Sequence, residues 1–187
     1  MAKSGNNVVT HGLSGQIGGI LVFKTVKGKT IVSASPRKSN RLPSEKQQEQ
    51  QKLFQEAVIY GKTVMVTPEL RAKYELSVPL GSSIYQVALA DFLHSPKFDE
   101  IDVTKYLGAP GNTIRIRVTD DFSVENVEVT IQNEDGSIVE NGQAVRMANG
   151  VDWLYTATVQ NNSLTGDKIL VRAFDLPGNI AESDVVL

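Results

Sequence analysis

Two Gly-Lys-Thr tripeptides are the residues in this chain whose types most suggest chemistry, because that sequence ends a phosphate-binding loop. They are Gly28-Lys29-Thr30 and Gly61-Lys62-Thr63. Such a loop also needs a glycine five residues before the second glycine and a helix directly after it, so that backbone amides surround the phosphate. Phe23 and Glu56 occupy the positions of those earlier glycines. The sequence therefore predicts no nucleotide site.

The other groups that carry out catalysis are absent or scattered. The chain has no cysteine, which excludes disulfides, thiolate metal sites and cysteine nucleophiles. His11 and His94 are far apart and lack a carboxylate cluster of ligand spacing, so we expect no zinc site. A glycosidase-like carboxylate pair could come only from Glu125, Glu128 and Asp152. These lie on or beside alternating strands, where outward charges form salt bridges, so we expect no enzymatic activity and no cofactor.

Three aspartates are candidate ligands for a calcium ion. Asp120, Asp121 and Asp175 could approach each other at one end of a sandwich of strands, where oxygen ligands sometimes bind calcium. Aspartate is also common in turns, where its side chain accepts hydrogen bonds from nearby backbone amides. Turn capping is the interpretation that we favour.

The second half of the chain alternates apolar and polar residues. Ile114, Ile116 and Val118 alternate with Arg115 and Arg117, and the rhythm returns near residues 124–132, 152–157 and 168–175. Period-two alternation buries one face of a sheet, and short strands at this spacing favour a sandwich of about seven strands. The glycines and proline of residues 104–113 mark the boundary. We therefore expect two domains, residues 1–103 and residues 104–187, the second an all-β immunoglobulin-like sandwich.

The first half predicts an α+β domain with a β-hairpin and about three helices. We expect a strand over residues 7–12, then a hairpin over residues 20–35 that turns at Lys27-Gly28, with Phe23 opposite Val32. Its two faces both carry apolar residues. The upstream glycines allow tight turns or close passage of another backbone.

The helices are predicted from their end signals. Ser44 with Gln47 forms a capping box, and Gly61 is the expected end of the first helix. Thr67-Pro68 opens a second helix, and a third helix runs from about Ser83 to His94. The third helix is apolar almost all round, which indicates burial either inside the domain or against another chain.

Two resemblances cover much of the chain. The motif Ala173-x-Asp175-x-x-Gly178-Asn179 resembles the end of bacterial immunoglobulin-like domains, where it shapes the turn into the last strand. The first half is similar to an uncharacterised family of small Bacteroidetes proteins, through residues Ser14, Gly15, Gly18, Val22, Phe23, Gly28, Lys29 and Pro36. That family brings no established activity, so the resemblance implies no functional residue.

Positive and negative charges are distributed unevenly between the two halves of the chain. Residues 1–100 carry 13 Lys and Arg against 8 Asp and Glu, whereas residues 101–187 carry 6 against 13. Such asymmetry occurs in proteins that bind nucleic acid and in copies that meet through complementary surfaces, and it also occurs where the charges only face solvent. The basic segment at residues 35–46 lacks aromatic residues for base stacking, so nucleic acid is not the expected partner.

We expect a non-enzymatic structural protein that self-assembles into a filament or particle through its hairpin half and displays the sandwich. An isolated hairpin with two apolar faces is marginal in water, so either the helices or neighbouring copies must cover it. The expected interface consists of Gly15, Gly18, Gly19, Ile20, Val22, Phe23, Ile31, Arg37, Lys38 and Arg41. The alternative is a binding module, with the sandwich recognising glycan or protein and the basic half contacting nucleic acid or an anionic surface.

The N-terminal residues lack a continuous apolar stretch and a cleavage site, so we expect no signal peptide. No run approaches the roughly 20 apolar residues that span a bilayer, so we expect no membrane partner. The expected location is the cytoplasm, or an assembled particle or filament released from the cell.

Overall fold

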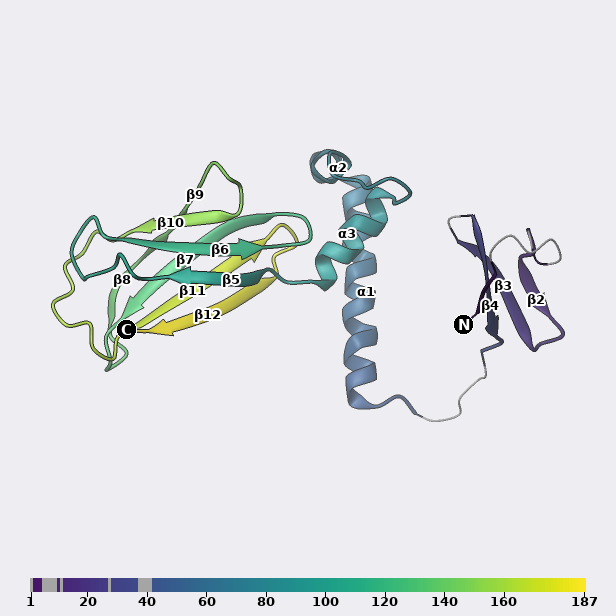
Figure 1. The fold of residues 1–187 in the computed structure, drawn as a ribbon, viewed down its shortest axis with the longest axis horizontal. Coiled ribbons are helices and arrows are strands. Elements are labelled where there is room, and N and C mark those ends of the chain that lie inside the picture. The colour runs from purple at the N-terminus through teal and green to yellow at the C-terminus, as the bar shows by residue number, and fades with distance from the viewer. Residues whose placement is uncertain (1, 5–9, 11, 27, 37–41) are drawn as a thin grey trace. The chain divides into compact units, whose positions relative to one another are not determined.

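The computed structural model describes residues 2–4, 10, 12–26, 28–36 and 42–187. The chain forms two compact units, Met1–Gln48 and Glu49–Leu187. Figure 1 shows the strands and helices of each unit. No helix in the described part of the chain is long and apolar enough to cross a membrane.

The first unit contains a four-stranded antiparallel sheet. Its strands are β1 (Ala2–Ser4), β2 (Gly15–Ile17), β3 (Leu21–Val26) and β4 (Lys29–Ala34), in the order β1-β4-β3-β2. The pairing of β3 with β4 places Phe23 opposite Val32, as the sequence predicts. Gly28, between β3 and β4, has a φ of 74°, and a two-residue hairpin turn requires such a positive φ. The first Gly-Lys-Thr therefore lies at the start of a strand and precedes no helix.

A second hairpin joins β2 to β3, and the sequence pattern did not predict it. Gly18 and Gly19 both have positive φ, 59° and 68°, which is the requirement of a type I′ turn. No atom lies within 4 Å of a Cβ built on either glycine, so conformation and not crowding within the chain demands glycine there. The strand expected over residues 7–12 falls mostly outside the described residues; Thr10 and Gly12 lie in turns.

Three helices follow in the described residues: α1 (Glu45–Val66), α2 (Pro68–Glu75) and α3 (Ile84–Leu93). The predicted capping box forms, since Ser44 and Gln47 exchange bonds of 2.9 and 3.4 Å. Ser83 and Gln86 form a second capping box at the start of α3, with bonds of 3.0 and 3.3 Å. Within α3 only Ala88 and Asp91 are buried. The rest of its surface is half-buried or exposed in the single chain, so α3 is not buried all round inside its own unit, and burial against another chain stays a prediction.

The expected end of α1 at Gly61 is also wrong, because the helix continues for five more residues to Val66. Gly61 is buried, and a Cβ on it would lie 2.9 Å from Cε2 of Tyr85 on α3. The glycine thus permits close packing of two helices. The second Gly-Lys-Thr is accordingly in the middle of a helix.

Two further four-stranded antiparallel sheets form a β-sandwich. One has the order β5-β6-β10-β9, with β5 (Lys97–Asp102), β6 (Thr113–Thr119), β9 (Val145–Arg146) and β10 (Asp152–Thr156). The other has the order β12-β11-β7-β8, with β7 (Val124–Gln132), β8 (Ile138–Gln143), β11 (Lys168–Asp175) and β12 (Ile180–Val186). The predicted alternation is confirmed, because one core joins the inward residues of both sheets, including Ile114, Ile116, Val129 and Val171.

The fold is therefore mixed α+β, as expected, and its second half is a β-sandwich. The division into residues 1–103 and 104–187 stays a prediction about which parts fold independently. Within the structure, β5 lies before that division and pairs with β6 after it.

A cross-strand ion pair lies on the outer face of the first sandwich sheet. Arg117 on β6 is paired in register with Asp152 on β10, and their side chains make two bonds of 2.7 and 3.1 Å. Asn149 Nδ2 donates a third bond of 2.8 Å to Asp152. The bond from Arg117, followed by that from Asn149, lowers the pKa of Asp152 to about 2. Salt bridging is thus confirmed for this aspartate.

Acid should weaken this interaction in a defined window. Because the pKa of Asp152 is lower in the folded protein than the value of about 3.9 in an unfolded chain, its contribution to stability is present above pH about 4. The contribution is lost as pH falls towards about 2. Urea unfolding should show a lower midpoint for Asp152→Asn than for the parent protein at pH 7, and nearly equal midpoints at pH 2. An equal gap at both pH values would contradict this assignment.

Candidate functional site

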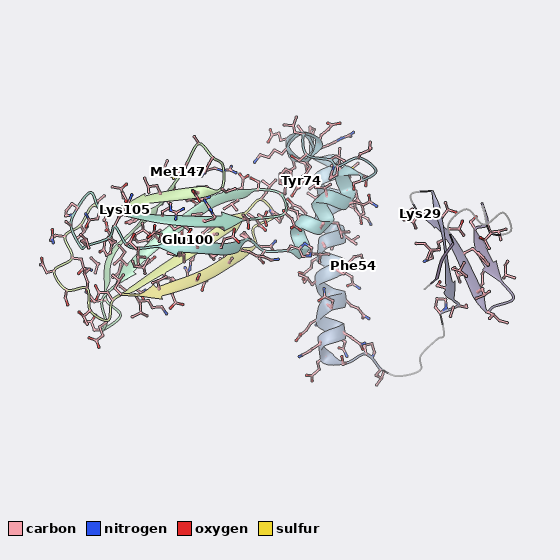
Figure 2. The ribbon with its side chains drawn as sticks, in the orientation of Figure 1. Lys29, Phe54, Tyr74, Glu100, Lys105 and Met147 are labelled. Atoms are coloured by element: carbon pink, nitrogen blue, oxygen red, sulfur yellow. The ribbon has the colours of Figure 1, made fainter. Side chains whose placement is uncertain are left out.

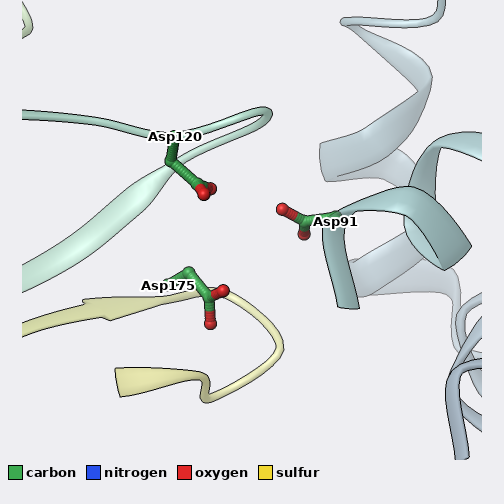
Figure 3. Close-up of side chains that lie close together, drawn as sticks. All are labelled: Asp91, Asp120 and Asp175. Atoms are coloured by element: carbon green, nitrogen blue, oxygen red, sulfur yellow. The ribbon is translucent and has the colours of Figure 1, made fainter. Parts of the chain in front are cut away.

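Three aspartates from distant parts of the chain converge where α3 meets one end of the sandwich. Asp91 lies on α3, Asp120 directly after β6, and Asp175 at the end of β11; one carboxylate oxygen of each lies within 4.8 Å of the others. Figure 3 shows the Asp91 carboxylate facing the other two. We call these three residues the aspartate cluster. All belong to the second compact unit.

The two strand-end aspartates are held by their own turns. Asp120 Oδ2 accepts bonds from the backbone amides of Phe122 (3.3 Å) and Ser123 (3.1 Å). Asp175 Oδ1 accepts bonds from the amides of Gly178 (2.8 Å) and Asn179 (2.6 Å). The expected turn capping is therefore confirmed at both positions. It fixes each carboxylate at the same end of the sandwich.

Asp91 is positioned by the helices. A small core of Val64, Tyr74 and Ala88 packs α1, α2 and α3 together and also contacts Phe122 and Leu176 in the sandwich loops. The Tyr74 hydroxyl donates a hydrogen bond to Asp91 Oδ2. Since that proton is committed to Asp91, the Tyr60 hydroxyl, 2.9 Å away, donates to the Tyr74 oxygen.

Asn179 fastens the end of α3 to the sandwich. Its Nδ2 donates to Asp175 Oδ2 at 2.7 Å and lies 3.2 to 3.4 Å from the carbonyl oxygens of Asp91, Phe92 and His94. These carbonyls lie at the C-terminal end of α3, where the helix offers few backbone donors, and that of Asp91 also accepts a bond from the His94 amide at 3.3 Å. The segment from Asp175 to Asn179 thus contributes both a turn and a link to the helices.

The cluster contains buried carboxyl oxygens without hydrogen-bond partners among the described residues. Asp91 is only 1% exposed, and its Oδ1 has no hydrogen-bond partner among the described residues; Asp120 Oδ1 is likewise buried without one. Burial raises the pKa of Asp91 to about 7, opposed by the Tyr74 hydroxyl and reinforced by the charges of Asp120 and Asp175. Burial also raises the pKa of Asp175, opposed by its bonds from Asn179 and Gly178. Three carboxylates at this spacing can share a proton or hold a hard cation.

Two surface hollows reach the cluster. One, of about 500 Å³, is lined by Asp91, Asp121 and Phe122 together with α3 residues. The other, of about 150 Å³, is lined by Asp120, Asp121, His94 and Lys97. Among the described residues, no ion pair joins a lysine, arginine or histidine to any member of the cluster.

The sequence grouped Asp121 with Asp120 and Asp175, and the structure does not. Asp121 Oδ2 instead lies 2.5 Å from His94 Nδ1 at the surface. Asp91 takes its place in the cluster and was missed. The available signal was an aspartate within an otherwise apolar helix, which is an expensive position for a charge. Of the glycosidase-like candidates, Glu125 pairs with Lys73 (3.4 Å), and Glu128 accepts a bond from Asn126.

The residues expected to form an assembly interface lie in the first unit. Gly15, Ile20, Val22, Phe23 and Ile31 lie on or beside β2, β3 and β4, and Gly18 and Gly19 form the turn between β2 and β3. Arg37, Lys38 and Arg41 lie outside the described residues. Within residues 12–36, only Phe23 and Thr30 are buried among those described, while Ile20 is 72% exposed. Figure 2 shows Lys29 on this sheet, and Phe54, 49% exposed, on α1.

Tyr74→Phe should destabilise the second unit by about 1–3 kcal/mol, because it leaves a buried oxygen of Asp91 without its donor. Tyr60→Phe is the matched control. It removes only the donor to Tyr74, whose own bond to Asp91 remains, and should cost less than about 1 kcal/mol. Urea unfolding followed by tryptophan fluorescence measures both. Equal losses would show that the Tyr74–Asp91 bond contributes nothing specific.

Comparisons with known proteins give only remote structural likeness. No family model and no curated protein matches this sequence. Among solved structures, CopC from Methylosinus trichosporium OB3b is similar over 48% of this chain and 88% of its own, with a TM-score of 0.38 and 16% identity. An engineered protein is similar over 55% of this chain and 25% of its own, with a TM-score of 0.33 and 18% identity.

Proposed function

We propose that this chain is a non-enzymatic structural protein whose copies assemble, as a filament or particle, through the sheet of the first unit. The observation that carries the proposal is that this four-stranded sheet has no adequate core of its own. Of its described residues only Phe23 and Thr30 are buried, while Ile17, Ile20, Leu21 and Val26 are exposed. The proposed occupant of the open faces is a second copy of the chain.

Both faces of the sheet supply apolar area. Register places Ile17, Leu21 and Phe23 on one face and Val22, Val26 and Ile31 on the other. A sheet normally buries at least one face against another layer. Contact with another copy would bury these side chains at about 25 cal/mol for each Å² of apolar surface.

Charge favours contact between unlike parts of neighbouring copies. Residues 1–48 contain eight Lys and Arg against one Asp or Glu, a net charge of +7, whereas residues 49–187 contain 11 against 20, a net charge of −9. Opposite surfaces of this kind accelerate encounter and favour defined partners. The attraction weakens as salt screens it.

We also propose that the sandwich is immunoglobulin-like and is displayed on the assembly. Two packed four-stranded antiparallel sheets support this, as does the turn that Asp175 forms before β12. An alternative function is a binding module in which the +7 segment contacts nucleic acid or another anionic surface while the sandwich recognises glycan or protein. That alternative predicts retention on DNA that falls steeply with salt.

Assembly should be visible by light scattering and negative-stain microscopy of the full chain at low salt. Ile20→Lys should raise the concentration needed for half-assembly by at least about tenfold, since burying an isoleucine contributes roughly 1.5–3 kcal/mol. Its fold should be preserved because Ile20 is exposed in the single chain.

Ile138→Lys is the matched control, because Ile138 lies on β8 of the sandwich and is similarly exposed at 63%. It introduces the same charge and should change the concentration for half-assembly far less than Ile20→Lys does, because no apolar contact is lost. A single monomeric species of the parent chain at high concentration and low salt would refute the proposal, and salt-sensitive DNA retention by that monomer would support the binding-module alternative.

A further inference from the structure

We propose that the aspartate cluster of Asp91, Asp120 and Asp175 binds a calcium ion, which fastens the helices to the sandwich. This site lies entirely in the second compact unit and is independent of the assembly proposed for the first. The inference begins from two buried oxygens, Asp91 Oδ1 and Asp120 Oδ1, that have no hydrogen-bond partner among the described residues. Figure 3 shows that Asp91 directs its carboxylate into the cluster.

Unpaired buried oxygens need an explanation. A buried polar atom without a partner loses its hydration and gains nothing in return, which costs about 1–3 kcal/mol and more when it is charged. Asp91 satisfies its other oxygen through Tyr74, and Asp120 satisfies its other oxygen through two backbone amides. The remaining oxygens can be satisfied by a proton that Asp91 and Asp120 share, since these two carboxyl groups lie within hydrogen-bond reach of each other, or by a cation that both bind.

The charged groups around the cluster do not supply that cation. Lys73 pairs with Glu125, and His94 pairs with Asp121. Lys97 lines the smaller hollow but forms no ion pair with the three aspartates. Tyr60 and Tyr74 face the cluster from α1 and α2 as neutral hydroxyls, and burial keeps both pKa values above their usual range.

The donor set identifies the class of cation. All three ligands are carboxylate oxygens, which hard cations prefer, whereas zinc in proteins usually takes nitrogen and sulfur. The candidate oxygens lie within 4.8 Å of one another, so one ion with Ca–O bonds of roughly 2.4 Å could contact all three. Magnesium requires shorter bonds of about 2.1 Å and retains several waters, so an enclosed carboxylate cluster suits it less.

Calcium also needs a route from solvent and further ligands. Calcium takes six to eight oxygens. The hollows of about 500 and 150 Å³ reach Asp91 and Asp120 respectively, and each has room for waters that complete the coordination. The three carboxylates would then be neutralised to a net charge of about −1 in the complex.

Binding at this point links elements that are distant in sequence. Asp91 belongs to α3, whereas Asp120 and Asp175 end strands in the two different sheets of the sandwich. An ion held by all three would strengthen the attachment already made by Tyr74 and Phe122, whose ring centroids are 4.3 Å apart. Calcium should therefore stabilise the second unit as a whole.

Thermal unfolding of the full chain tests the proposal with calcium chloride, magnesium chloride or EDTA as the additive. If the dissociation constant is about 0.1 mM, 10 mM calcium should raise the Tm by roughly 5–10 °C relative to EDTA. Magnesium should produce a much smaller shift. Terbium, which substitutes for calcium, should show luminescence sensitised by the nearby tyrosines, and calcium should displace it.

The variant Asp91→Asn should change stability differently in EDTA and in calcium. The asparagine oxygen can still accept the Tyr74 bond, while removal of one buried negative charge relieves repulsion. In EDTA the variant should therefore be at least as stable as the parent protein, and in calcium it should lose the Tm shift and the terbium signal. Asp121→Asn, adjacent to the cluster but bonded to His94, should retain both.

Each outcome decides the question. A calcium shift lost in Asp91→Asn and retained in Asp121→Asn supports the site. No shift at 10 mM calcium overturns it and assigns the cluster to a shared proton. A shift that magnesium reproduces, or that Asp91→Asn retains, overturns it in favour of unspecific binding to surface carboxylates.

Discussion

The buried carboxylate of Asp91, near the end of α3, is the group on which the contacts between the helices and the sandwich depend. Asp91 is almost completely buried, and removing a charge from water costs several kcal/mol unless its surroundings compensate. Tyr74 donates to one oxygen, and Asn179 binds the adjacent helix carbonyls. The aromatic contact of Tyr74 with Phe122 follows from the same placement. The helices and the sandwich are therefore joined by two neighbouring contacts, the hydrogen bonds around Asp91 and Asn179 and the ring contact of Tyr74 with Phe122.

Features with local causes could be predicted from the sequence. The alternation of Ile114, Ile116 and Val118 defines an inward face without reference to the rest of the chain, and the capping boxes at Ser44 and Ser83 involve residues three apart. Features with tertiary causes could not be predicted. Gly61 has the type that commonly ends a helix, but it serves close packing against Tyr85 far along the chain. Tight turning at the upstream glycines was predicted from local signals, but the short strand β2 that the Gly18-Gly19 turn joins to β3 was not.

In the candidate site too, the residues with local roles were predicted and the residue with a tertiary role was not. Asp120 and Asp175 were found because strand-end aspartates cap turns by local bonds. Asp121 was grouped with them because of adjacency in sequence, but its side chain lies at the surface beside His94. Asp91 depends on the docking of α3 against the sandwich, which no short stretch of sequence encodes.

The sheet of the first unit ends in two different edges, since β1 lies at one side and β2 at the other. An interface in which β1 of one copy pairs with β2 of the next is heterologous, and each added copy presents a fresh edge identical to the one just used. Such growth has polarity and stops only if it closes into a ring. Contact between opposite faces of two copies is heterologous in the same way, whereas contact between the same face of two copies joins like with like and ends at a two-fold dimer. The number of subunits and the polarity of an assembly therefore reveal which part of this sheet makes the contact.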